Sequence, residues 1–531
     1  MNWESEMTKA RVGLGQPSDG LAYWKGRATK RMPLGLAYIA AALARAGHEV
    51  KTVDASLHDL SIEETAQQLL ANDPHIVGLT FTTPLYHQAV AIMERIKQLS
   101  PKTVVVVGGP HVTYLPRATL ETSKADFVCI GEGEVSMPAI VDCVLGGGDP
   151  SGIVGIAYDW ESYQGQTQSR RNKVGEDRDK FAPPVNLNAV PIPARELFEY
   201  SEYYDLSRSK KGPQTGAMFS RGCPGKCSFC DAANTIVRWR DIENVINELR
   251  IVESLGIPNL FVMDDTFTVQ RKRVLALSKG IVESGVKLNI SVQLRLDQTD
   301  PEICDAMFAS GVRYVHPGIE SGNEDIIKAI GKGPRESKHH MREKVRLLQQ
   351  YPWTVRCSYV FGMPGETEDQ MLETIAFAAE LNADENAFSI LVPYPGSPLW
   401  TTALDLGKVN PYMDFSRFLY YRTVGVNLSA VPTNRLLALN QFAYDYVGNR
   451  AFNFPDVSIS SGNRPHVPFD PKDIANLPNL PGTDFSVQRE EGVRHRPARP
   501  AGECTVQAVR DAFEQYLIKH PVEETEEEAM V

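Results

Sequence analysis

The sequence predicts an α/β protein with two consecutive series of parallel strands and helices, followed by a mostly helical or irregular C-terminal region. Short β-branched runs alternate with helical stretches from about residue 11 to 160, and again from about 215 to 391. The strand segments are continuously apolar, which is typical of parallel strands buried on both faces. After about residue 405 the pattern weakens, so a third kind of region is expected there.

The first series predicts a doubly wound, Rossmann-like domain over residues 1–160. Strands are expected at residues 49–54, 76–81, 103–107, 127–130 and 152–159, and helices at 34–46, 62–70, 85–99 and 135–145. Ligands of such sheets bind outside the carboxyl ends of the strands. Residues 161–205 are polar and then proline-rich, so a linker is expected before the second series.

The second series, within residues 206–405, predicts a parallel barrel or part of one. Strands are expected at residues 215–220, 259–263, 289–293, 314–317, 356–361 and 387–391, and helices at 242–255, 273–284, 301–310, 337–350 and 368–381. Six strand–helix repeats at roughly 25–45 residue spacing fit that architecture. Residues 406–531 are expected to hold helices at 435–450 and 506–520 and to end in a disordered acidic tail.

Composition excludes several classes of function. The net charge is −11, so the basic footprint that nucleic-acid binding requires is missing. No apolar run reaches the ~18 residues that would predict a membrane span. The first residues lack the basic start and apolar core of a signal peptide, so a cytoplasmic location is expected. Eight cysteines in 531 residues do not form a disulfide scaffold.

Three of those cysteines form a cluster in the segment MFSRGCPGKCSFCD, residues 218–231. Cys223, Cys227 and Cys230 have the spacing Cys-x₃-Cys-x₂-Cys and follow the first strand of the second series. Three thiolates can hold three irons of a [4Fe–4S] cluster. The fourth iron then stays open, which distinguishes a reactive centre from a closed structural one. The alternative is a zinc site completed by a distant ligand.

This motif, with Phe229 just before the third cysteine, resembles the signature of the radical S-adenosylmethionine enzymes. The resemblance covers roughly residues 210–400 and implies a partial (β/α)₆ barrel. It further implies that the open iron binds the amino and carboxylate groups of S-adenosylmethionine. Cleavage by an electron then gives a 5′-deoxyadenosyl radical that abstracts hydrogen. An external electron donor of the flavodoxin or ferredoxin type is implied as a partner.

Other barrel segments resemble the family's S-adenosylmethionine contacts. Asp264 and Asp265 end the second strand, where the family has an acceptor for the methionine ammonium; a helix N-cap is the alternative. Gln293 and Arg295 share a strand face and could reach the methionine carboxylate or ribose; a strand-end salt bridge is the alternative for either. The remaining implied contacts are Phe229 near the adenine, Glu320 and Ser321 near the ribose, and Gly362 and Gly365 in a Gly-x-Pro-Gly-Glu loop. Cys357 and His316 lie on strands and are expected to pack.

The first domain resembles the cobalamin-binding module that precedes the barrel in one radical S-adenosylmethionine subfamily. The resemblance rests on residues 33–50, 78–89, 108–116 and 125–134. A nucleotide tail entering such a sheet needs hydroxyls and tight glycine turns at strand ends. The candidates are Thr80, Thr82, Thr83, Gly108, Gly109 and Gly131, while His111 either approaches the corrin or makes a loop hydrogen bond. An Asp-x-His-x-x-Gly motif is missing, so no histidine of that loop is expected to ligate cobalt, and His58 is interpreted as a surface residue.

Together the two resemblances imply a cobalamin-dependent radical S-adenosylmethionine methylase. One S-adenosylmethionine would methylate cob(I)alamin, and a second would be cleaved at the cluster. An unactivated carbon of a small natural-product substrate would then take the methyl group from methylcobalamin, with residues 406–531 supplying much of the substrate wall. A cyclisation, rearrangement or oxidative step, and methyl transfer to phosphorus, are alternatives with the same cofactors. Methylthiolation is disfavoured because a second cysteine triplet is missing; a non-catalytic carrier is the remaining alternative.

Overall fold

The computed structural model describes residues 9–18, 31–158, 185–203, 212–333, 336–419, 423–447 and 504–522. The chain divides into two compact units. Among the described residues, the first unit contains those up to Tyr203 together with Val409–Arg417, and the second unit contains the others. Most of the predicted linker at 161–205 and the acidic tail lie outside the described residues.

The first unit is built on a six-stranded sheet with the order β2-β1-β3-β4-β5-β6. Its strands are β1 (Arg11–Gln16), β2 (Glu49–Asp54), β3 (Ile76–Thr80), β4 (Val104–Gly108), β5 (Phe127–Cys129) and β6 (Ile156–Tyr158). The first five are parallel, and β6 is antiparallel to β5. The strand order reverses at β1, which pairs with β2 on one side and β3 on the other. That reversal is the switch point at which doubly wound sheets bind ligands.

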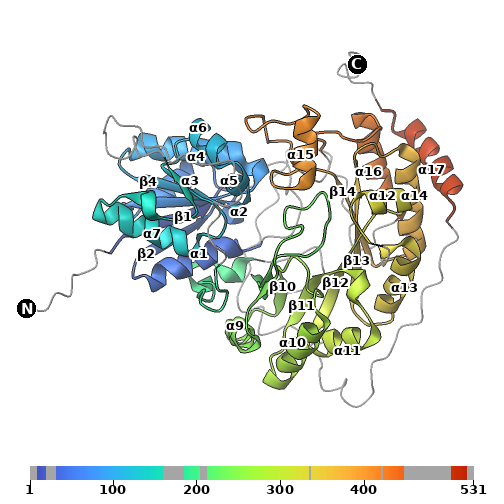
Figure 1. Ribbon diagram of the computed structural model, residues 1–531, viewed down its shortest axis with the longest axis horizontal. Helices are drawn as coiled ribbons and strands as arrows, with labels where there is room; N and C mark the ends of the chain where they lie inside the picture. The colour runs from blue at the N-terminus through green and yellow to red at the C-terminus, as the bar shows by residue number, and fades with distance from the viewer. Residues whose placement is uncertain are drawn as a thin grey trace, which may run out of the picture. The chain divides into compact units, whose positions relative to one another are not determined.

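Helices cover both faces of this sheet, as Figure 1 shows. The elements are α1 (Leu34–Arg45), α2 (Ala55–His58), α3 (Ile62–Leu70), α4 (Tyr86–Leu99), α5 (Pro110–Tyr114), α6 (Pro116–Thr122) and α7 (Gly133–Gly146). Helices α1 and α7 pack together, and α3 and α4 pack together. The connections β1–β2 and β2–β3 run in opposite directions across the sheet, so right-handed crossovers place α1 and α3 on opposite faces. The predicted doubly wound fold is therefore confirmed.

The second unit contains a six-stranded sheet with the order β7-β10-β11-β12-β13-β14. Its strands are β7 (Gln214–Ala217), β10 (Asn259–Val262), β11 (Asn289–Leu294), β12 (Val312–Glu320), β13 (Thr354–Phe361) and β14 (Glu385–Ile390). All neighbours are parallel, and each strand pairs with the next one along the chain. This is the predicted partial (β/α)₆ barrel. The first predicted strand is split, however: it stops at Ala217, and β8 (Ser220–Arg221) pairs with β9 (Arg238–Trp239) instead.

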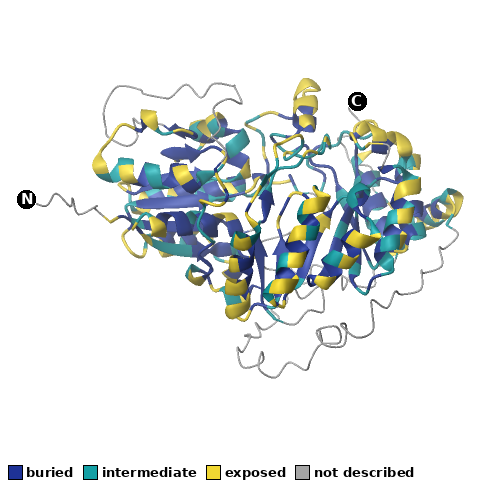
Figure 2. Ribbon diagram, turned by 60° about the horizontal axis from the view of Figure 1, so that its bottom comes forward, coloured by how far each residue is buried: buried dark blue, intermediate teal, exposed yellow. Residues whose placement is uncertain are grey.

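Helices cover the outer face of the barrel strands. These helices are α9 (Ile242–Ser254), α10 (Arg271–Ser284), α11 (Pro301–Ala309), α12 (Glu324–Ala329), α13 (Lys338–Gln349) and α14 (Glu368–Leu381), followed by α15 (Pro398–Asp405), α16 (Thr433–Val447) and α17 (Val506–Lys519). Figure 2 shows buried strands behind helices whose outward surfaces are exposed. Helix α16 packs on β14 and α14, and α17 packs on α14 and α16. None of the described helices combines the length and apolarity needed to cross a membrane.

Side-chain alternation on β13 separates the outer face of the barrel from its lumen. Cys357, Tyr359 and Phe361 are completely buried, and the residues between them are only half-buried. The Tyr359 ring stacks on Phe388 of β14 at 4.9 Å, and Phe388 meets Tyr444 of α16. Cys357 therefore faces the helices and packs there, as the sequence analysis expected.

Candidate functional site

The three cysteines lie in one loop that folds back on itself between β8 and β9. The Cys223 N–H donates to Thr235 Oγ1 at 2.9 Å, and the Thr235 N–H donates to the Cys223 carbonyl at 2.9 Å. The Cys230 N–H donates to the Cys227 carbonyl at 3.1 Å. Gly222 has φ 99°, and a Cβ there would collide with the carbonyl of Ile236. Only glycine permits this closure of the loop.

Contacts from distant elements fix the loop at the carboxyl end of the barrel. The Ser228 N–H donates to the Ile330 carbonyl at 3.0 Å, and the Leu399 N–H donates to the Ser228 carbonyl at 2.9 Å. The Phe229 side chain packs against an apolar cluster made of Ile326, Ile330, Met363, Leu391 and Leu399. Phe229 thus anchors the loop beside the third cysteine, and its contact with adenine stays a prediction.

The cysteine side chains fit a cluster better than a single metal ion. Burial raises the pKa of all three thiols, that of Cys230 to about 12. Thiols in such surroundings stay protonated unless a metal displaces the proton. In the described structure the three sulfurs do not all lie within 4.8 Å of one another. A tetrahedral zinc with bonds of about 2.3 Å would hold them about 3.8 Å apart, whereas in a cluster each thiolate has its own iron.

The two aspartates after β10 have different roles. Asp264 is buried: Oδ1 accepts from the N–H groups of Phe219 (2.6 Å) and Ser220 (3.0 Å), and Oδ2 accepts from the Ser220 hydroxyl at 2.6 Å. Burial raises its pKa to about 6. Asp265 is exposed and accepts from the Gly222 N–H at 2.8 Å. Neither caps a helix, because α10 begins after Gln270. Asp264 therefore anchors the start of the loop, and Asp265 lies beside the cysteines.

The end of β11 carries the next two predicted contacts. Gln293 is exposed and lies in register with His316 of β12. Arg295 follows the strand, and its guanidinium donates to Asp297 Oδ1 at 3.1 Å and to Glu336 Oε2 at 2.6 Å. The salt bridge that the sequence left open for this position is thus present. A Cβ on Gly225 would lie 3.0 Å from Arg295 Nη1, so the guanidinium borders the cysteine loop.

At the end of β12, Glu320 and Ser321 are both held by other groups. Glu320 has φ 69°, an uncommon conformation for a non-glycine residue that marks functional or strained sites. Its Oε1 lies 3.6 Å from the ammonium of Lys332. The Ser321 hydroxyl lies 3.0 Å from Thr374 Oγ1 and accepts from the Asn323 N–H at 3.1 Å. Ser321 therefore takes part in fixing the turn that follows the strand.

The Gly-x-Pro-Gly-Glu loop closes on its own glutamate. Gly362 and Gly365 have φ 97° and 71°. Glu366 Oε2 accepts from the N–H groups of Gly362 (2.8 Å) and Met363 (3.0 Å), and burial raises its pKa to about 7. Among the described residues, Glu366 Oε1 has no hydrogen-bond partner. This buried carboxylate ends the Gly-x-Pro-Gly-Glu motif, but it was not predicted from the sequence as a site residue.

Two further charged residues of the site, Lys332 and Glu336, were also missed. Their side chains are only 4% and 2% exposed, and both residues lie between β12 and α13. A lysine between Gly331 and Gly333 was the available signal, because glycines allow close backbone approach. A Cβ on Gly331 would collide with the carbonyl of Lys226 in the cysteine loop.

In the first unit, the predicted residues meet at the carboxyl ends of β3, β4 and β5. Gly109 has φ 103°, and a Cβ there would lie 2.8 Å from both the Phe81 carbonyl and Thr80 Oγ1. The Gly131 N–H donates to Thr113 Oγ1 at 3.1 Å, and this hydroxyl donates to the Gly109 carbonyl at 2.9 Å. Gly108 ends β4, while Thr82 (exposed) and Thr83 (buried) follow β3. The structure thus brings all six predicted threonine and glycine residues to one edge.

His111 lies at the same edge in an aromatic cluster. Its ring stacks on Tyr86 at 4.5 Å and meets the edge of Phe415 at 5.0 Å. Burial lowers the pKa of His111 to about 3, so the imidazole stays neutral. Its Nδ1 has no hydrogen-bond partner within the described part of the chain. The predicted loop hydrogen bond is therefore not made by this nitrogen.

The structure of the segment after β2 also shows no arrangement like that of an Asp-x-His-x-x-Gly motif. Asp54 Oδ1 accepts from Gln16 at 2.8 Å, and Asp54 Oδ2 accepts from the Tyr203 hydroxyl at 2.8 Å. His58 is partly exposed, and its Nε2 lies 2.6 Å from Glu199 Oε2. His58 is thus a surface residue with an acidic partner, as the sequence analysis interpreted it.

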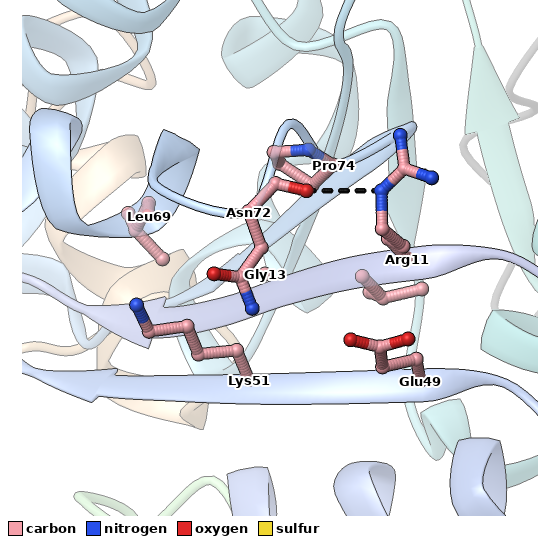
Figure 3. A pocket seen from close by; sticks show the side chains of 8 residues that line it. Arg11, Gly13, Glu49, Lys51, Leu69, Asn72 and Pro74 are labelled. Carbon is pink, nitrogen blue, oxygen red and sulfur yellow. Dashed lines mark hydrogen bonds between the residues drawn. The ribbon is translucent and has the colours of Figure 1, made fainter.

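A shallow hollow at the opposite edge of the first sheet is separate from these sites. Figure 3 shows it at the start of β1 and β2, where Arg11 donates to the Asn72 carbonyl. It is lined by Arg11, Val12, Gly13, Glu49, Lys51, Leu69, Asn72 and Pro74. Because it opens at the amino ends of the strands, it is not the ligand site expected for this fold.

Comparisons with known proteins match a different family in each half of the chain. Residues 27–141 match the B12 binding domain family, and residues 218–378 match the radical SAM superfamily. The chain is 33% identical to an uncharacterized methyltransferase of Pyrococcus horikoshii, over 70% of this chain and 78% of the relative. It is 26% identical to a cytidylyl-2-hydroxyethylphosphonate methyltransferase of Streptomyces wedmorensis (73% and 80% covered). It is 25% identical to an anaerobic magnesium-protoporphyrin IX monomethyl ester cyclase of Rubrivivax gelatinosus (73% and 68%).

Two solved structures share the fold. The radical S-adenosylmethionine methyltransferase TsrM from Kitasatospora setae, solved with cobalamin and a [4Fe–4S] cluster, superimposes with a TM-score of 0.59 at 20% identity, covering 76% of each chain. The cobalamin-dependent S-adenosylmethionine radical enzyme OxsB gives a TM-score of 0.63 at 18% identity, covering 83% of this chain and 67% of OxsB. At these identities the likeness extends to the fold.

Proposed function

Because this chain belongs to the family of cobalamin-dependent radical S-adenosylmethionine methylases, we propose that it moves a methyl group from S-adenosylmethionine, by way of cobalamin, to an unactivated carbon of a small natural-product substrate. The enzyme takes a [4Fe–4S] cluster, S-adenosylmethionine and cobalamin as cofactors. When bound, the cluster supplies the electron that cleaves S-adenosylmethionine, and cobalamin supplies a carrier for the methyl group. We further propose an external flavodoxin- or ferredoxin-type electron donor.

One observation carries the proposal: two carboxyl edges suited to different cofactors occur in a single chain. The barrel edge holds Cys223, Cys227 and Cys230 in a glycine-closed loop. The edge of the first sheet, next to its switch point, is made of threonines and glycines. A radical enzyme without cobalamin would need only the first edge, and a cobalamin carrier would need only the second.

In the barrel, each side chain has a proposed task. The three cysteines hold the cluster and leave one iron open. Asp265, whose carboxylate is exposed beside the loop, accepts from the methionine ammonium, while Asp264 keeps the loop in position. Gln293, Arg295 and Glu320 contact the methionine carboxylate and the ribose, and Gly362 and Gly365 let the backbone approach the ligand.

In the first unit, the proposed roles follow from the shape of the loops at the carboxyl ends of the strands. Thr80, Thr82 and Thr83 offer hydroxyls to the cobalamin nucleotide tail, and the glycine turns make room for it. The neutral ring of His111 supports the corrin without bearing a charge. Residues 406–531 contribute to the substrate wall; the contacts of Leu428 and Ala430 with the Gly-x-Pro-Gly-Glu loop support this role.

A second candidate function is an oxidative cyclisation or rearrangement with the same cofactors. It is favoured by the likeness to the anaerobic cyclase of Rubrivivax gelatinosus. Methyl transfer to phosphorus is the third, with the same cofactors; one relative is a methyltransferase named for a phosphonate substrate.

The products of turnover separate these candidates. The protein is purified without oxygen, reconstituted with iron, sulfide and cobalamin, and given S-adenosylmethionine, a reductant and pooled candidate substrates. Equal amounts of 5′-deoxyadenosine and S-adenosylhomocysteine are expected for radical methylation, with a methylated carbon in the product. 5′-Deoxyadenosine alone would support cyclisation. A chain that binds no cobalamin would refute the proposal.

A further inference from the structure

A buried lysine lies behind the cysteine loop and binds three oxygen atoms. The Lys332 ammonium donates to the Gly318 carbonyl at 2.6 Å and lies 3.3 Å from Glu336 Oε1 and 3.6 Å from Glu320 Oε1. Its side chain is 4% exposed. An ammonium removed from water is tolerated only when good partners replace the water. A buried lysine with three oxygen partners is therefore not an ordinary surface charge, and its place in the structure calls for an explanation.

Glu336 extends this contact to a second strand end. One oxygen faces Lys332, and the other accepts from Arg295 Nη2 at 2.6 Å. The Glu336 side chain is 2% exposed. A single carboxylate thus links Arg295, after β11, to Lys332 and through it to Glu320, at the end of β12. Arg295 and Glu320 are the residues assigned above to the methionine carboxylate and the ribose.

The Glu320 end of this network depends on the lysine. Glu320 has φ 69°, and its carboxylate folds back over Gly318, where a Cβ would collide with Glu320 Oε1. Such a backbone persists only when the surroundings enforce it. The ammonium provides that constraint, since it binds both the Gly318 carbonyl and the Glu320 carboxylate.

The network also touches the loop that carries the cluster ligands. The Lys226 carbonyl lies against Gly331, the residue before Lys332, and the Ser228 N–H donates to the Ile330 carbonyl. Arg295 lies against Gly225. The ion network thus fixes two predicted ligand-binding side chains relative to the cysteines.

We propose that Lys332 and Glu336 are positioning residues for S-adenosylmethionine: they hold Arg295 and Glu320 in the arrangement that the bound molecule requires. This inference rests on the function proposed above. Neither residue needs to touch the ligand. Their removal is expected to weaken S-adenosylmethionine binding while the cluster remains, because the cysteines and their loop hydrogen bonds are untouched.

The test follows the change in the electron paramagnetic resonance spectrum of the reduced, reconstituted cluster as S-adenosylmethionine is added. Lys332→Met and Glu336→Gln are compared with the wild type, with Lys332→Arg as the conservative variant. Glu343→Gln is the matched control, because this exposed glutamate of α13 lies 3.4 Å from the exposed His339 and away from the buried network. Iron content and absorbance report the cluster separately.

We expect both variants to keep the cluster and to need about 10- to 100-fold more S-adenosylmethionine for the spectral change, as is typical when outer-shell partners are removed. Lys332→Arg should recover part of the affinity, and Glu343→Gln should match the wild type. Variants that titrate like the wild type would overturn the inference. If Lys332→Met does not fold, Glu336→Gln decides; if neither folds, the pair is purely structural and the inference is wrong. A wild type whose cluster spectrum ignores S-adenosylmethionine would instead contradict the proposed function.

Discussion

The two six-stranded sheets place their candidate sites at the same kind of edge but build them differently. In the first unit the edge consists of backbone turns and neutral rings: Gly109 and Gly131 adopt positive φ, and His111 is an uncharged imidazole. In the second unit it consists of buried ions, with Arg295, Glu336 and Lys332 in contact. Both edges lie at carboxyl ends, so the difference arises from the side chains that each loop contributes.

This contrast fits the ligands that the family uses. A large macrocycle is held by the shape of a preformed site. A small molecule with a carboxylate and an ammonium is oriented by charge-assisted hydrogen bonds, which are short and directional. We infer that the first edge tolerates changes of charge and is sensitive to added volume, and that the barrel edge is sensitive to changes of charge.

The largest effect is expected from Cys227→Ala, which removes one iron ligand. Cluster absorbance should disappear, and 5′-deoxyadenosine formation should fall by at least about 1000-fold, since residues that act as a unit lose nearly all their rate together. Cys143→Ala is the control, because this half-buried thiol lies on α7 of the first unit. A Cys227→Ala protein that keeps its cluster and its activity would refute the cluster assignment.

A smaller effect is expected from Gly109→Val, which tests sensitivity to volume in the first unit. The new side chain would meet the Phe81 carbonyl and Thr80 Oγ1, both 2.8 Å from an ideal Cβ. Cobalamin retention on gel filtration should be lost, and unfolding of this unit should cost about 1–3 kcal/mol less because of overpacking. Gly147→Val is the matched control, since Gly147 also has positive φ but faces open space. Equal behaviour of the two variants would show that backbone strain alone matters.

The smallest effect is expected from Glu366→Gln, which tests a buried carboxylate at the barrel edge. The folded protein holds this proton more tightly than the unfolded chain, with a pKa of about 7 against an ordinary value of 4.5. Stability should therefore fall as pH rises from about 4.5 to about 7, by at most about 3 kcal/mol, and stay level above that. Thermal unfolding across this pH range should show the slope in the wild type and a flatter curve in the variant. If the substitution leaves the slope unchanged, a group other than Glu366 causes the pH dependence of stability.

Sequence patterns predicted the architecture well because buried parallel strands leave a strong apolar signal. The predicted segments at 76–81, 103–107 and 127–130 overlap the buried strands β3, β4 and β5, and those at 62–70 and 368–381 coincide with α3 and α14. Strand β1, with two glycines in six residues, and the short helices α5 and α6 give too weak a signal and were missed. The first barrel strand was predicted to reach residue 220, but β7 ends at Ala217. Asp264, 44 residues after Ser220, accepts from the Ser220 N–H, and a contact so distant in the sequence could not be foreseen.

The candidate site was predictable only where residues belong to compact motifs. The cysteine loop and the glycine turns are local in sequence, so their spacing indicated their place. Lys332 and Glu336 contact residues that lie 4 to 41 positions away in the sequence. A buried ion network of this kind produces no periodic pattern or fixed residue spacing by which the sequence could reveal it. Phe415 packs on His111 from a segment that follows the barrel, which no local pattern reveals.

The most direct test of the account is the iron and cobalt content of three proteins purified without oxygen and reconstituted side by side: the wild type, Cys227→Ala and Gly109→Val. We expect about four irons and one cobalamin per wild-type chain, cobalt without iron in Cys227→Ala, and iron without cobalt in Gly109→Val. Zinc in place of iron, a wild type without cobalt, or the loss of both metals in either variant would contradict two separate cofactor sites in this chain.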